Sequence, residues 1–186
     1  MRMFLIASTM ITQSNYAEAC DIQWLDLGPT PFSSEYIPQG LSRNDDGIIL
    51  SVYSNEHHPH VRFFGFQQDW KEFSGTTEPL RHTSGIVPYQ DTFFLIDYET
   101  GYIARATLED FTITINAIFQ TGQPSISSGF VINDGEVEYL AISTFGLFGS
   151  ILYYQIGPLV EGDGGTVSPE FTHSAGSFIQ GNYSHE

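Results

Sequence analysis

Two histidines occupy matching places in a repeated pattern of this sequence. His82 and His173 each stand three residues before the glycine of a short recurring segment. Imidazole titrates near neutral pH, so a histidine in such a place can bind a ligand or transfer a proton. A repeated histidine can equally serve packing, with its ring bonded to a neighbouring backbone group. We therefore take His82 and His173 as candidate ligand-binding residues and assign no catalytic residue.

A second group of chemically active residues is the run Glu56-His57-His58-Pro59-His60. Zinc needs ligands that converge tetrahedrally, whereas adjacent residues of an extended chain point to opposite faces. His58 and His60 would share a face, but a third ligand would have to come from elsewhere. A solvated loop is the favoured interpretation, and these two histidines are only weak metal candidates.

Acidic turns raise the question of calcium. Asp45-Asp46-Gly47 and Asn133-Asp134-Gly135 carry the oxygen ligands that this cation prefers. Asx-Gly pairs are also the ordinary residues of tight turns, and the sequence lacks a twelve-residue calcium loop. The cofactor is therefore unassigned, with a divalent cation such as calcium left open.

These residues are positioned by a repeat that runs through the chain. Four similar segments begin near residues 37, 82, 126 and 173, and each contains a glycine. The intervals between the glycines are 45, 44 and 47 residues. Self-similarity at such a period is typical of repeat architectures. The structural glycines are Gly40, Gly85, Gly129 and Gly176.

Each of the first three repeats divides into four short strands, and no stretch of twelve residues has helical periodicity free of Gly and Pro. The expected strands are 40–42, 48–54, 60–67 and 70–74 in the first repeat. They are 85–88, 92–98, 102–108 and 112–120 in the second, and 129–132, 137–144, 150–156 and 166–171 in the third.

Four strands in about 45 residues match one blade of a β-propeller. The repeated glycine would lie in the innermost strand, where blades converge and a residue without a Cβ fits. A sandwich or a barrel does not predict a motif at this interval. We therefore expect an all-β protein, a β-propeller with about three full four-stranded blades. Ile22–Leu27 and Gly176–Gln180 would add partial strands, so we expect an incomplete or truncated propeller that forms an open arc and associates in isolation.

The blade starts Pro38-Gln39-Gly40-Leu41 and His82-Thr83-Ser84-Gly85-Ile86, with the strand end Leu95-Ile96-Asp97, resemble a broad superfamily. It contains the gluconolactonase, strictosidine synthase-like and paraoxonase-like propellers and the NHL-repeat proteins, and the resemblance covers about residues 36–179. It implies a propeller fold and, for the enzymes of the superfamily, calcium-dependent lactonase or esterase chemistry at an axial metal. A full ligand set cannot be matched here, so no position is carried over as catalytic.

The N-terminal residues predict an export signal. Arg2 supplies positive charge, residues 3–11 form a short apolar run, and Ala17-Glu18-Ala19 fits the small-x-small rule of signal peptidase. We expect a signal peptide over 1–19 and propeller repeats over 20–186. A buried N-terminal strand is the alternative interpretation of the apolar run.

Cleavage after Ala19 would leave Cys20, the single cysteine, as the first residue of the mature chain. A lipoprotein carries its lipid at this place, although Glu18 and Ala17 fit the lipoprotein pattern poorly. No later apolar stretch has membrane length. We therefore expect a secreted, periplasmic or extracellular protein without a transmembrane segment, with a lipid anchor left open.

Charge and composition limit the partners. The formal net charge is −16, with 6 Lys and Arg against 22 Asp and Glu, so the chain cannot supply the cationic face that nucleic acid requires. Two function classes remain. The favoured one is a non-enzymatic exported propeller that binds a small molecule, glycan or protein on its channel face. The alternative is a metal-dependent lactonase- or esterase-like hydrolase.

Overall fold

The structure is a computed structural model that describes residues 2–7, 23–29, 36–44, 47–54, 57–64, 71–72, 75, 77–146 and 149–174. The chain divides into two compact units, residues 1–34 and residues 35–186. In the first unit, β1 (Arg2–Ala7) pairs antiparallel with β2 (Gln23–Pro29). The strand expected at Ile22–Leu27 is thus present as β2, but its hydrogen-bonded partner is β1 rather than a blade. Export stays a prediction, and Ala19 and Cys20 lie outside the described residues.

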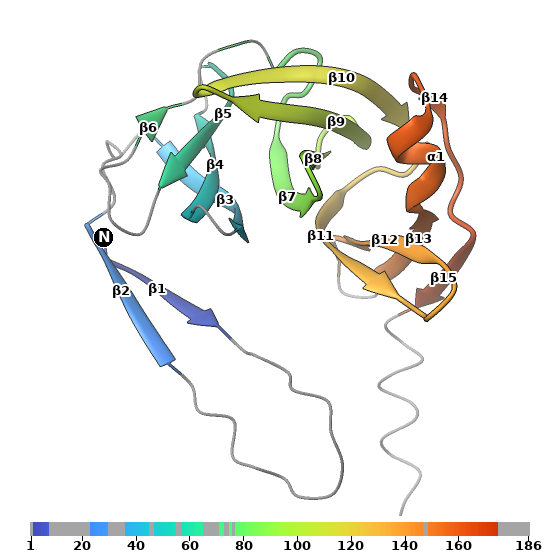
Figure 1. Ribbon diagram of the computed structural model, residues 1–186, viewed down its shortest axis with the longest axis horizontal. Coiled ribbons are helices and arrows are strands. Elements are labelled where there is room, and N and C mark those ends of the chain that lie inside the picture. The colour runs from blue at the N-terminus through green and yellow to red at the C-terminus, as the bar shows by residue number, and fades with distance from the viewer. Residues whose placement is uncertain are drawn as a thin grey trace, which may run out of the picture. The chain divides into compact units, whose positions relative to one another are not determined.

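The second unit is built of three sheets, and in each of them all strands but one short strand, β14, follow the order of the chain (Figure 1). The first sheet contains β3 (Tyr36–Asn44), β4 (Gly47–Ser54), β5 (His57–Phe64) and β6 (Lys71–Glu72). The second contains β7 (Thr83–Tyr89), β8 (Thr92–Asp97), β9 (Tyr102–Glu109) and β10 (Thr112–Gln120), with β14 (Gly165–Thr166) added beside β10. The third contains β11 (Ile126–Asn133), β12 (Glu138–Thr144), β13 (Ser150–Gln155) and β15 (Phe171–Ser174).

The expectation of a β-rich chain is confirmed, with three corrections in the third repeat. A short helix, α1 (Ile156–Glu161), follows β13 directly. The strand expected at 166–171 is found instead at β15, five residues later. Residues 165–166 pair in parallel with β10 of the second sheet. None of these differences has a signature in the local sequence. A six-residue helix has too few turns to show a period, and pairing with a distant strand depends on residues far away in the sequence.

The sheets pack face to face through their apolar side chains. Residues alternate across β8, so Phe93 and Leu95 join the core shared with Ile49 of the first sheet, while Phe94 and Ile96 join the core shared with the third. The first strands lie side by side, with β7 beside both β3 and β11. The order of the strands within each sheet therefore brings the starts of the first three repeats to a common region.

Serine side chains join neighbouring sheets in this region. The Ser51 hydroxyl accepts from the Gly40 amide (2.8 Å) and donates to the Thr83 carbonyl (2.8 Å). The Ser84 hydroxyl lies within hydrogen-bonding distance of the Ile126 and Ser127 carbonyls, at 3.3 and 3.1 Å. The small serine side chains thus supply hydrogen-bond donors to backbone carbonyls of the neighbouring sheet.

Tyr154 is almost completely buried in the core between the second and third sheets. Burial raises its pKa to about 12, because the phenolate would lose its hydration. An unfolded chain has a tyrosine pKa of about 10, so the stabilisation that this group contributes below pH 10 is lost as the pH rises towards 12.

Tyr154→Phe should therefore flatten the alkaline loss of stability, by at most about 1.4 kcal/mol per pH unit. Urea unfolding at a series of pH values between 9 and about 12 measures this slope. Tyr102→Phe, at a half-buried position on β9, controls for the removal of one tyrosine hydroxyl. Equal slopes for Tyr154→Phe and the parent chain would contradict the expectation.

Candidate functional site

One end of the sheets gathers polar and aromatic side chains from all three. Thr83 pairs with Asp97 and Ile126 pairs with Thr144, so the starts of β7 and β11 lie at the same end as the loops after β8 and β12. Four side chains follow one another there: Gln39 of β3, His82 before β7, Tyr98 after β8 and Phe145 after β12. We call these four residues the polar-aromatic row.

The contacts within the row are direct. His82 Nε2 lies 2.9 Å from Gln39 Oε1. The rings of His82 and Tyr98 have centroids 5.3 Å apart and are tilted by 58°. Tyr98 and Phe145 meet edge to face at 5.8 Å and 85°, which is the favoured arrangement of aromatic pairs. Phe145 is nevertheless 70% exposed, so its ring offers an open surface at the end of the row.

Asp97 fixes the backbone on which His82 and Tyr98 stand. Its carboxylate is fully buried and accepts hydrogen bonds from the backbone amides of Arg81, His82 and Thr100 and from the Thr100 hydroxyl. The Tyr98 amide also donates to the His82 carbonyl, at 2.9 Å. The turn after β8 is thus held against the segment before β7, which sets the distance between the two rings.

A hollow of about 360 Å³ lies beside Phe145. We call it the serine hollow, and it is lined by Ser127, Ser143, Thr144, Phe145 and Gly146. The Ser143 and Ser128 hydroxyls are 3.0 Å apart at this end of β11 and β12. This volume falls within the range of about 300–1,000 Å³ that is usual for small-molecule sites. Hydroxyls beside an exposed ring can orient a polar ligand that has an apolar face.

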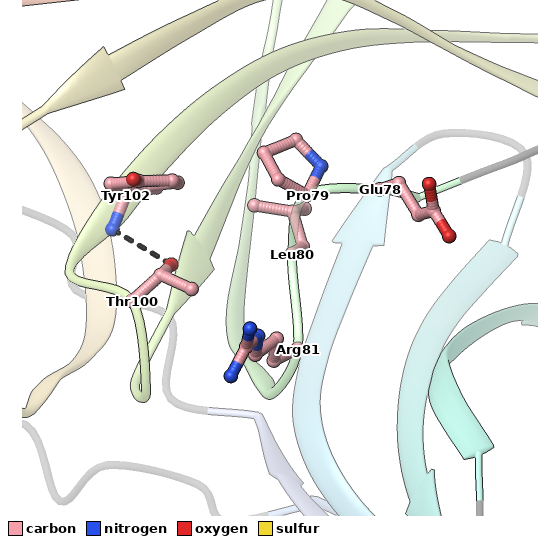
Figure 2. A pocket seen from close by; sticks show the side chains of 6 residues that line it. All are labelled: Glu78, Pro79, Leu80, Arg81, Thr100 and Tyr102. Atoms are coloured by element: carbon pink, nitrogen blue, oxygen red, sulfur yellow. Dashed lines mark hydrogen bonds between the residues drawn. The ribbon is translucent and has the colours of Figure 1, made fainter.

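A second hollow of about 340 Å³ lies at the same end of the second sheet (Figure 2). We call it the Arg81 pocket, and it is lined by Glu78, Pro79, Leu80, Arg81, Thr100 and Tyr102. The Arg81 guanidinium is 3.2 Å from the Glu99 carboxylate, with both side chains largely exposed. The Thr100 hydroxyl donates to Asp97 Oδ1 (2.7 Å) and accepts from the Tyr102 amide (3.3 Å). The Arg81 guanidinium and the Thr100 hydroxyl of this pocket thus already bind other residues of the chain.

The two candidate histidines do not occupy equivalent places. His82 precedes the first strand of its sheet and lies in the polar-aromatic row. His173 lies within β15, the last strand of the third sheet, where its ring contacts Tyr153 and Phe171 at 5.4 and 5.8 Å. The expected equivalence is therefore wrong, because the long segment after β13 delays the fourth strand until residue 171. A ligand-binding role remains a prediction for both.

The structure assigns a turn role to one of the acidic segments. Asn133 Oδ1 accepts from the Gly135 amide (2.7 Å), and Asp134 Oδ1 accepts from the amides of Val137 (2.8 Å) and Glu136 (3.0 Å). These backbone donors hold the pKa of Asp134 below its usual value. The carboxylate oxygen expected to attract a cation thus closes the turn between β11 and β12.

The remaining metal candidates receive no structural assignment. The backbones of His58 and His60 belong to β5, but their side chains, like Asp45, Asp46 and Gly176, lie outside what the structure describes. Within the described part of the chain, no group of three or more His, Cys, Asp or Glu side chains could hold a metal ion. Across the same residues, no helix is long and apolar enough to cross a membrane.

No family model, curated protein or solved structure matches this chain. The site must therefore be judged from its own residues, and sequence reasoning found only His82 among them. Tyr98 and Phe145 share one signal that could have revealed them, since each is the first residue after the second strand of its sheet. Gln39 lies in the motif Pro38-Gln39-Gly40-Leu41, but nothing in that motif indicated a contact with His82.

Proposed function

We propose that this chain is an exported β-propeller that binds a ligand at the end of its sheets, over the polar-aromatic row and the serine hollow, without transforming it. The observation that carries the proposal is the convergence of Gln39, His82, Tyr98 and Phe145 from three successive sheets on one end. A site assembled from several repeats is typical of repeat proteins that bind a ligand across their common face.

The contacts between first strands support the propeller architecture. A Cβ added to Gly40 would lie 2.9 Å from the Ser84 carbonyl oxygen, and one added to Gly85 would lie 2.7 Å from the Ser127 carbonyl oxygen. Gly40 and Gly85 thus each approach the backbone of the next first strand closely. Close approach of the innermost strands is what a radial arrangement of blades requires.

The side chains of the site support binding rather than a defined reaction. The row and the serine hollow supply rings, hydroxyls and one amide, which are groups that orient a ligand. Among the described residues, no group of His, Cys, Asp or Glu side chains offers the metal site that the hydrolase alternative needs. Substitution of His82 tests the hydrolase alternative, because imidazole can act as a general base.

A ligand screen tests the proposal. The full chain is screened by thermal shift against neutral, acidic and basic small molecules and oligosaccharides, and each hit is titrated into Phe145→Ala and Phe111→Ala. Phe111 is 37% exposed in the turn between β9 and β10, at the opposite end of the second sheet, and serves as the matched control. We expect at least one ligand whose affinity falls about tenfold in Phe145→Ala and is unchanged in Phe111→Ala.

Two results would contradict this proposal. Ligands that bind Phe145→Ala and the parent chain equally would place binding elsewhere. Consumption of a hit by the parent chain, lost in His82→Ala, would instead favour the hydrolase.

A further inference from the structure

We propose that the ligand of the serine hollow is a neutral glycan, an inference that rests on the proposed binding function. The first argument is charge. None of the residues of the polar-aromatic row or the serine hollow is Asp, Glu, Lys or Arg. A charged ligand would enter this hollow without an ionic partner, and burying an unpaired charge is costly. The net charge of −16 further repels anionic ligands.

The second argument is the combination of a ring with hydroxyls. Phe145 is held from one side by the edge contact with Tyr98, while 70% of its surface stays open. The Ser143 and Thr144 hydroxyls beside this ring bond to Ser128 and Ser150, and each can still accept one more hydrogen bond, which a purely apolar ligand would not supply. A sugar ring satisfies both, because one face presents C–H groups to the aromatic ring and its rim presents hydroxyls.

The third argument is the extent of the row. From the serine hollow, Tyr98, His82 and Gln39 continue across the end of the second sheet to β3. The row presents aromatic surface from Phe145 to Tyr98 and hydrogen-bonding groups from the Tyr98 hydroxyl to His82 and Gln39. A linear oligosaccharide presents both C–H faces and hydroxyls along its length, so we infer that more than one sugar unit is bound, with the terminal one on Phe145.

Isothermal titration calorimetry with defined oligosaccharides tests the ligand class. The probes are linear oligomers of glucose, xylose and N-acetylglucosamine, with uronic acid oligomers of similar length as the anionic comparison. We expect one of the neutral series to bind, longer members to bind more tightly, and the uronic acid oligomers not to bind. Phe145→Ala should weaken binding by about tenfold, which corresponds to about 1.4 kcal/mol. Phe145→Tyr should recover part of this loss, and Phe111→Ala should bind like the parent chain.

The outcomes separate this inference from the function on which it rests. Binding of uronic acid oligomers alone, or neutral binding that does not depend on Phe145, would overturn the glycan assignment. If another class of molecule binds in a Phe145-dependent manner and no neutral oligosaccharide does, the glycan is wrong and the binding function stands. If no ligand of any class depends on Phe145, both are wrong. Far-ultraviolet circular dichroism of each variant verifies that it is folded.

Discussion

Asp97→Ala should destabilise the protein by about 3 kcal/mol, which corresponds to a fall in melting temperature of about 6–12 °C for a unit of this size. The carboxylate is fully buried, and its two oxygens accept four hydrogen bonds from Arg81, His82 and Thr100. Alanine removes every one of these acceptors and leaves three backbone amides to find new partners. Thermal and urea unfolding measure the change.

A matched control is available in the same sheet. Asp91 is exposed in the turn between β7 and β8, and Asp91→Ala should lie within about 0.5 kcal/mol of the parent chain. Because Asp97 also holds the turn that carries Tyr98 against the segment that carries His82, a folded Asp97→Asn variant should bind the ligand of the row more weakly. Asp97→Ala and Asp91→Ala with the same melting temperature would show that the carboxylate does not hold this end of the sheet together.

Gly85→Ala should cost about 2 kcal/mol, whereas the same substitution at Gly157 should be neutral or stabilising by up to about 1 kcal/mol. A Cβ at Gly85 would lie 2.7 Å from the Ser127 carbonyl oxygen and 3.1 Å from Ile96 Cδ1. The carbonyl belongs to β11 and can retreat only if β7 and β11 separate. Gly157, in α1, has no heavy atom within 4 Å of its added Cβ.

Gly129 provides an intermediate case that tests the reason rather than the size of the effect. Its added Cβ would first meet Ile96 Cδ1 at 2.6 Å, which is the end of a flexible side chain, and only then the Ala141 carbonyl oxygen at 3.0 Å. Gly129→Ala should therefore cost less than Gly85→Ala. The urea midpoint should be lowest for Gly85→Ala, intermediate for Gly129→Ala and highest for Gly157→Ala. A lower midpoint for Gly157→Ala than for Gly85→Ala would contradict close strand contact as the reason for the repeated glycine.

The first two repeats could be divided into strands from the sequence because their patterns are local. The apolar runs after Gly40 and Gly85 and the turn after Asp97 carry the alternation and turn residues of hairpins. The expected strand 112–120 coincides with β10, and 92–98 differs from β8 by one residue. The third repeat was predicted less well after β13, where α1 and β14 depend on contacts with β9 and β10.

Arg105 illustrates such a contact. Its guanidinium donates to the carbonyl oxygens of Leu159 and Val160 at the end of α1, although it lies 54 residues earlier in the sequence than the first of them. A lone arginine in a strand gives no sign that it will bind the C-terminal carbonyls of a distant helix. The helix is therefore fixed by tertiary structure, which a reading of neighbouring residues cannot supply.

The candidate site could be predicted only where it coincided with the repeat. His82 was found because it precedes a repeat glycine. Phe145 was not found, because its role in the site comes from its exposure beside the serine hollow. The periodicity of a sequence does not show whether a single aromatic residue is exposed. The same reasoning misplaced His173, since the spacing to Gly176 was taken to mark a first strand, whereas the strand order places the residue in β15.

The pairing of β14 with β10 shortens the exposed edge that the second sheet could offer to a strand of another chain. A nine-residue outermost strand with free amides and carbonyls is a template on which a strand of another chain can add, and such addition starts aggregation. In this protein β14 occupies the last two residues of β10, and the Val167 amide binds the Gln120 carbonyl. An irregularity between Ile115 and Ala117 interrupts the register of the same strand. Within the described part of the chain, the regular run of β10 is thereby divided into short pieces, and a short piece offers few consecutive hydrogen bonds to an incoming strand.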